Sequence, residues 1–243
     1  AGALAHAMRC VAVPGQDIIT FAPFFPEYTV FVHNANAKAV VLPPDTEHFQ
    51  ISLDALEKAI TPHTRAIIIN SPNNPSGVVY SADTYEKLAA LLTRKSQEIG
   101  HPIYIISDEP YREIIYDGLP ILYVPKFYKD TIICYSYSKS LSLPGERIGY
   151  VLVPDCAADA QEVYTAVCGA ARSMGFVCAP HLFQDVVLKC LGQTGDMNIY
   201  DENRKLLYNG LREMGYDCVY PSGAFYLFVK SPEADAKAFS DKA

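Results

Sequence analysis

Strand-like and helix-like segments alternate along most of this sequence, and this alternation limits the fold more than any other feature. Short apolar runs predict six strands, at 17–23, 37–43, 65–70, 102–108, 131–137 and 147–154. Apolar residues at helical spacing predict helices at 2–12, 26–37, 51–60 and 81–100. Because strands and helices follow each other in turn, the chain is expected to form an α/β fold around a mainly parallel sheet.

The expected helix ends carry recognisable residues. Ser52 is a candidate N-cap for the short helix at 51–60, and Gly100 is suited to end the long helix that begins near Ser81. Helices are expected to dominate residues 156–215, and SGAFYLFVK at 222–230 predicts a final strand.

Three of the expected strands end in polar residues: RAIIIN runs into SPNNP, IYIISD into EPY, and ICYSY into SK. In open α/β sheets, ligands bind beyond the carboxyl ends of the strands. The chain therefore predicts a binding site at one edge of its sheet. The residues available there are Asn74, Asp108, Tyr111, Ser136, Ser138, Lys139 and Arg147.

These side chains suit one kind of ligand when they are taken together. Ser136 and Arg147 can bind a phosphate, and Lys139 can react with a carbonyl. Asp108 and Tyr111 can hold opposite edges of an aromatic heterocycle. Each residue alone has an ordinary alternative, such as a surface lysine, a helix cap or a turn, so the inference depends on their order and spacing.

Charge and cysteine content exclude several other classes of protein. The net charge of −7 disfavours nucleic acid and anionic membrane as partners, and no apolar run approaches the length of a membrane span. The seven cysteines are irregularly spaced without a CxxC pair, which disfavours a disulfide framework or a metal site. We expect reduced thiols in a cytoplasmic protein.

Four motifs in order resemble fold-type I pyridoxal 5′-phosphate (PLP) aminotransferases of class I/II. They are SPNNPSG (71–77), SDEPY (107–111), SYSKSLSLPGERIGY (136–150) and PSGAFYLF (221–228). The resemblance implies a three-layer large domain that binds PLP and a small C-terminal domain. Residues 1–195 would form the large domain, and 196–243 the connecting helix and the start of the small one.

The resemblance also implies roles for the residues above. Lys139 would form the aldimine with PLP and then act as base and acid at the substrate α-carbon. Asp108 would pair with the pyridine nitrogen, while Tyr111 and Asn74 would donate to the phenolate oxygen of the cofactor. Arg147 and Ser136, with Ser138, would bind the phosphate.

The first residues of the chain supply two more candidates by resemblance. AGAL looks like the end of the loop before a phosphate-binding helix, which places Ala1 and Gly2 beside the phosphate. FAPFFPEY resembles the segment with the aromatic ring that stacks on the pyridine. By position this ring is Phe25, with Phe24 as the alternative.

Two expected parts of an aminotransferase are not found. The family has an N-terminal segment at a dimer interface, whereas this chain opens at Ala1 within a helix-like segment, so we expect the natural N-terminus and any targeting signal to be absent. No arginine follows Arg212 to bind a substrate α-carboxylate. We expect the chain as it stands to hold PLP poorly and to transaminate poorly or not at all.

The implied reaction of the parent protein, which by resemblance is a homodimer, is amino transfer between an L-amino acid and a 2-oxo acid. PLP would become pyridoxamine phosphate and return. Two alternatives stay open: a PLP-dependent carbon–sulfur β-lyase or aminocyclopropane-carboxylate-synthase-like enzyme, and the PLP-sensing domain of a transcription regulator. The sequence does not identify the amino acid or the oxo acid.

Overall fold

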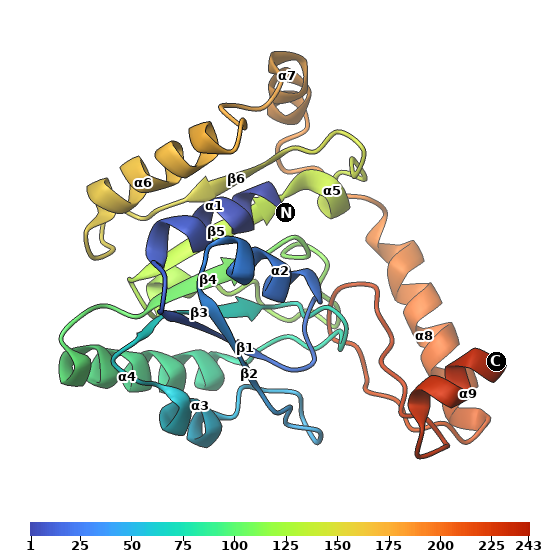
Figure 1. The fold of residues 1–243 in the computed structure, drawn as a ribbon. Helices are drawn as coiled ribbons and strands as arrows, with labels where there is room; N and C mark the ends of the chain where they lie inside the picture. The colour runs from blue at the N-terminus through green and yellow to red at the C-terminus, as the bar shows by residue number, and fades with distance from the viewer.

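A six-stranded sheet in the order β2-β1-β3-β4-β5-β6 forms the centre of the computed structural model, which describes residues 1–243 (Figure 1). Its strands are β1 (Asp17–Phe21), β2 (Lys38–Leu42), β3 (Thr64–Asn70), β4 (Tyr104–Asp108), β5 (Thr131–Ser136) and β6 (Gly149–Leu152). Neighbouring strands are parallel except β6, which runs antiparallel to β5 at the edge. The expected α/β fold with a mainly parallel mixed sheet is confirmed.

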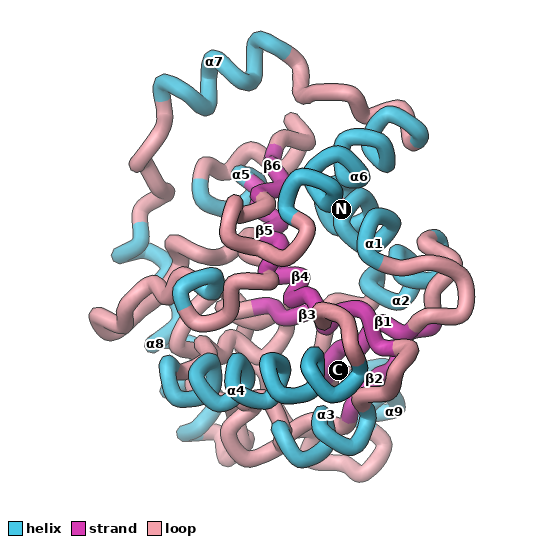
Figure 2. The backbone as a smooth tube through the Cα atoms, turned by 90° about the vertical axis from the view of Figure 1, so that its left-hand side faces the viewer, coloured by secondary structure: helices cyan, strands magenta, loops and turns pink.

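Helices cover both faces of the sheet and give the molecule three layers (Figures 1 and 2). One face carries α1 (Gly2–Val11), α2 (Glu27–Asn34) and α6 (Ala160–Ser173). The other face carries α3 (Leu53–Ala59) and α4 (Ala82–Ile99). The remaining helices are α5 (Tyr137–Ser140), α7 (His181–Lys189), α8 (Met197–Glu213), α9 (Ala236–Lys242) and the short 3-10 helix η1 (Val124–Lys126).

The apolar run of β3 shows why this strand has no polar face. Ala66 and Ile68 belong to the core under α1 and α2, whereas Ile67 and Ile69 belong to the core under α3 and α4. Successive side chains of a strand point to opposite faces, so the part of a strand that lies between two helical layers is apolar at successive positions.

The ends of α4 follow the residues expected from the sequence. Ser81 accepts a hydrogen bond from the backbone N–H of Thr84, and Gly100 ends the helix in the left-handed conformation at φ 79°. Ser52 occupies the N-cap position of α3, but its side chain makes no capping hydrogen bond. Ser52 therefore stands at the expected N-cap position, but the expected capping hydrogen bond does not form.

The strand expected at 222–230 does not form. Only isolated bridges join Gly223 to Ile115 and Val229 to Cys218. Ala224 has φ 56°, which interrupts an extended conformation, and the neighbouring backbone N–H groups bond to two separate loops. The expected strand at 131–137 also ends one residue early, because Tyr137 begins α5.

Residues beyond α6 extend away from the three layers. Figure 1 shows α7 above the sheet and α8 and α9 to one side of it. The division into a large domain of 1–195 and a connecting helix with the start of a small domain at 196–243 stays a prediction. No helix has the length and apolar character of a membrane span.

Leu92 of α4 offers a test of the packing on this face, because its side chain is fully buried in the core. Leu92→Ala should lower the free energy of unfolding by roughly 2–5 kcal/mol through lost burial and a residual cavity. Chemical denaturation measures the change. Thr93→Ala, at the exposed next position, is the matched control and should have an effect within about 0.5 kcal/mol. Equal effects of the two substitutions would contradict the packing described.

Candidate active site

The register of three central strands brings their polar carboxyl ends into line. Asn70 of β3 pairs with Asp108 of β4, and Asp108 pairs with Cys134 of β5. The segments that follow these residues are the SPNNPSG loop, the EPY turn, and Ser136 with α5. Three motifs that are far apart in the sequence therefore leave the sheet at one edge, as the strand order requires.

Asp108 is a partly buried carboxylate with one side-chain partner. The Tyr28 hydroxyl donates to its Oδ2 at 2.6 Å, and the Asn70 amide donates to its backbone carbonyl at 2.8 Å. Burial raises the pKa of Asp108 to about 6, and the bond from Tyr28 partly offsets this rise. A cation placed beside Asp108 would relieve the cost of burying its charge.

Tyr111 lies buried beside the SPNNPSG loop. Its hydroxyl shares a hydrogen bond of 2.6 Å with the hydroxyl of Tyr226. Burial raises the pKa of Tyr111, and the Asn74 side chain acts in the opposite direction. The Asn74 backbone is held in turn by Asn70, whose Oδ1 accepts from its N–H at 2.7 Å. Tyr111 therefore stays a neutral phenol that can donate a proton to an acceptor.

Ser136 connects β5 to α5 and presents Lys139. The Ser136 hydroxyl accepts from the Ser138 N–H at 3.2 Å and donates to the Ser138 hydroxyl at 2.8 Å. Lys139 is half-buried, with its Nζ 5.2 Å from the centre of the Phe225 ring. No carboxylate lies within ion-pair distance of Lys139. Its amine is therefore available to a ligand.

Arg147 lies at the same edge of the sheet, just before β6. Ser136 of β5 pairs with Gly149 of β6, and the Tyr137 N–H donates to the Ile148 carbonyl. Arg147 directly precedes Ile148 and therefore lies near the start of α5. Arg147 has φ 53°, a conformation that non-glycine residues seldom adopt. Its exposed guanidinium donates to the Pro144 carbonyl at 2.5 Å and forms no ion pair.

For the candidates near the start of the chain, Ala1, Gly2 and Phe25, the structure shows position and packing but no hydrogen bond to another candidate residue. Ala1 is the N-cap residue of α1 and Gly2 its first residue, and α1 packs against β4 and β5. Phe25 meets the Tyr28 ring edge-on at 5.7 Å, whereas Phe24 stacks on it at 6.2 Å. Since both rings are half-buried around Tyr28, the packing does not distinguish Phe25 from Phe24 as a stacking partner for a ligand.

The structure adds four residues that sequence reasoning did not assign to the site: Tyr28, Asn70, Phe225 and Tyr226. Phe225 and Tyr226 belong to the PSGAFYLF motif, so their position in a motif was the available clue. Tyr28 ends the FAPFFPEY segment and Asn70 ends the expected strand RAIIIN, but a tyrosine in a helix and an asparagine at a strand end are too common to be assigned a role on that basis.

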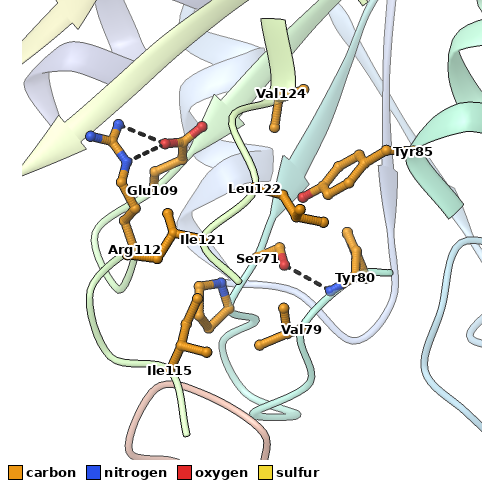
Figure 3. Close-up of a pocket in the computed structure, with 11 residues that line it drawn as sticks. Ser71, Val79, Tyr80, Tyr85, Glu109, Arg112, Ile115, Ile121, Leu122 and Val124 are labelled. Carbon is orange, nitrogen blue, oxygen red and sulfur yellow. Dashed lines mark hydrogen bonds and ion pairs between the residues drawn. The ribbon is translucent and has the colours of Figure 1, made fainter. Parts of the chain in front are cut away.

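A second buried carboxylate, Glu109, follows Asp108 but faces a different pocket (Figure 3). The Arg112 guanidinium donates to Glu109 Oε2 at 2.6 Å, and the Ser107 hydroxyl donates to its Oε1 at 2.7 Å. Burial raises the pKa of Glu109, and Arg112 partly offsets that rise. The pocket of Figure 3 is lined largely by apolar residues and by none of the predicted site residues. Glu109 is thus a buried carboxylate whose charge is paired with Arg112.

Comparison with known proteins agrees with the α/β fold of this chain. A model of the family described as aminotransferase class I and II matches residues 1–243. The crystal structure of an amino transferase from Eubacterium rectale is 60% identical with a TM-score of 0.97, covering 99% of this chain and 61% of that one.

Two curated relatives are similar over most of the chain. The aromatic-amino-acid aminotransferase 2 of Thermococcus litoralis is 31% identical over 93% of this chain and 58% of its own length. The aspartate aminotransferase of Rhizobium meliloti is 32% identical over 93% of this chain and 55% of its own length. The chain thus spans a little over half the length of these relatives.

Burial of Asp108 makes a prediction about pH. Its pKa is raised in the folded state, so the folded protein binds more protons than the unfolded one between pH about 4 and 6, and stability falls as pH rises through that window. In protein freed of small-molecule ligands, Asp108→Asn removes this loss. The variant should gain roughly 1–3 kcal/mol relative to wild type between about pH 4.5 and 7.5.

Chemical denaturation at the two pH values measures this gain. Asp54→Asn is the matched control, since it removes an exposed carboxylate on α3 that has no burial cost to relieve. A gain for Asp108→Asn that is no larger than that of the control would contradict the burial described for Asp108.

Proposed function

The chain belongs to the aminotransferase class I and II family, and from this membership we propose that its parent protein transfers an amino group from an L-amino acid to a 2-oxo acid with PLP as cofactor. The observation that carries the proposal is the meeting of Asp108, Tyr111 and Lys139 at one edge of the sheet. Together they supply a carboxylate, a neutral phenol and an unpaired amine.

The donor set fits the ring of PLP. Asp108 would pair with the protonated pyridine nitrogen, since a cation there relieves the cost of its burial. Tyr111, with Asn74 beside it, would donate to the phenolate oxygen at the opposite edge, and the ring of Phe25 would lie against its face. When bound, PLP supplies an electron sink for the charge that develops at the substrate α-carbon.

The cations and hydroxyls around α5 fit the phosphate. Arg147 has no acidic partner, and its planar guanidinium suits a phosphate as a two-pronged donor. Ser136 and Ser138 would add hydroxyl groups from the start of α5. The first turn of α1, at Ala1 and Gly2, would contribute backbone N–H groups and the positive end of the helix dipole.

Lys139 would carry PLP and then move the proton at the substrate α-carbon. The lack of a carboxylate partner leaves the amine free for both tasks, and the Phe225 ring shields one side of it. The parent protein is proposed to be a cytoplasmic homodimer. The seven free thiols support the cytoplasmic assignment, and the amino acid and 2-oxo acid substrates follow from the family.

Spectroscopy of the half-reaction tests the proposed activity. The full-length protein should show the visible absorbance of lysine-linked PLP, and an L-amino acid added alone should convert it to the absorbance of the amine form of the cofactor. Release of pyruvate without a 2-oxo acid acceptor would instead indicate a lyase. Lys139→Ala should abolish the visible absorbance, whereas Lys129→Ala, at an exposed lysine, should retain it. A reducible lysine-linked cofactor in Lys139→Ala would contradict the assignment of Lys139.

Arg147 allows a separate test of the phosphate site. Arg147→Ala should weaken PLP binding by at least about tenfold, because a charge-assisted two-pronged contact contributes roughly 1.5–3 kcal/mol. Equilibrium titration of the cofactor-free protein with PLP measures the change. Arg172→Ala, at an exposed arginine of α6, should leave the affinity unchanged. Equal affinities for the two variants would remove Arg147 from the site.

A further inference from the structure

The segment 221–226, which we call the docked loop, is attached to two of the site motifs by its backbone. The N–H groups of Ser222 and Gly223 both donate to the Gly77 carbonyl at 2.9 Å, in the SPNNPSG loop. The Ala224 N–H donates to the Ile114 carbonyl at 2.8 Å, just after the SDEPY motif. The docked loop is therefore part of the same structural unit as Asn74 and Tyr111.

Close packing leaves the docked loop little freedom. A Cβ atom on Gly223 would lie 2.7 Å from the Pro72 side chain, and one on Gly77 would lie 2.7 Å from Pro221. Two buried hydrogen bonds add to this packing: the Tyr116 hydroxyl donates to the Ala224 carbonyl at 2.6 Å, and Arg204 of α8 donates to the Pro221 carbonyl at 2.8 Å. Tyr226 at the end of the loop is thereby held in one position relative to Tyr111.

The 2.6 Å contact between Tyr111 and Tyr226 raises a question of direction, because each hydroxyl has a single proton to donate. If Tyr111 gave its proton to Tyr226, it would have none for a ligand. If Tyr226 donates, the Tyr111 proton stays free, and its O–H becomes a stronger donor because hydrogen bonds in a chain polarise one another.

We propose that Tyr226 is a positioning residue of the active site, which donates to the Tyr111 hydroxyl and so directs the Tyr111 proton toward the phenolate oxygen of the cofactor. This inference rests on the proposed function. It assigns the docked loop a role in tuning the cofactor, in addition to its structural role between α8 and the sheet edge.

Other titratable groups also face this pair. They are Asp108 from β4, Tyr28 from α2 and, across the Phe225 ring, Lys139 from α5. Replacing Tyr226 by Phe keeps the ring and leaves these groups in place. A change in the titration of the cofactor in Tyr226→Phe can then be assigned to the missing hydroxyl.

The test is a pH titration of the visible absorbance of the bound cofactor in the full-length protein. Tyr226→Phe should keep PLP bound, and the midpoint should rise by roughly half a pH unit or more, the size expected for loss of one ordinary hydrogen bond. Tyr200→Phe is the matched control, since Tyr200 stacks on the Phe225 ring at 5.8 Å but its hydroxyl has no hydrogen-bond partner. Its midpoint should equal that of wild type.

A double variant separates a role through Tyr111 from a general effect. Tyr111→Phe should raise the midpoint, and Tyr111→Phe/Tyr226→Phe should raise it no further, because Tyr226 has no phenol left to act on. An unchanged or lowered midpoint in Tyr226→Phe, or additive shifts in the double variant, would overturn the inference. The absence of visible absorbance from wild type would instead refute the proposed function, so the two failures are distinguishable.

Discussion

The parallel register of β3, β4 and β5 is the constraint on which the site depends. It aligns Asn70 with Asp108 and Asp108 with Cys134, so the chain segments after these residues must emerge together. The sheet in turn requires an apolar layer on each face, which α1, α2 and α6 supply on one side and α3 and α4 on the other.

Burial and the absence of acidic partners set the charge and the donor or acceptor character of the residues at this edge. Asp108 is held partly buried with a single phenol as side-chain partner, so its charge is costly until a cation is placed beside it. Tyr111 is buried and stays neutral, which keeps it a donor. Lys139 and Arg147 have no acidic partner, so both are free to meet an anionic, carbonyl-bearing ligand. The site thus combines one buried negative charge with two cations left free for the ligand.

The docked loop connects this edge to the later part of the chain. Arg204 of α8 forms a two-pronged ion pair with Asp117 at 2.8 Å and also holds the Pro221 carbonyl, so α8 is tied to the loop through one buried side chain. Gly77 and Gly223 permit the close approach of the docked loop to the SPNNPSG loop, because a Cβ atom at either position would collide with a proline of the other loop. The strand pairing expected at 222–230 was lost because its backbone groups bond to the two loops instead.

The sequence by itself determined the layered α/β fold and named the candidate site residues that lie in contiguous motifs, such as Lys139 and Asp108. Strand–helix alternation and motif spacing are local properties, and a sheet of given strand order then brings the motifs together. Only the tertiary structure decided that Tyr28 bonds Asp108 and that Tyr226 bonds Tyr111. These partners are 80 and 115 residues apart, and no local pattern specifies which tyrosine reaches which group. The choice is made by the packing of α2 and of the docked loop against the sheet edge.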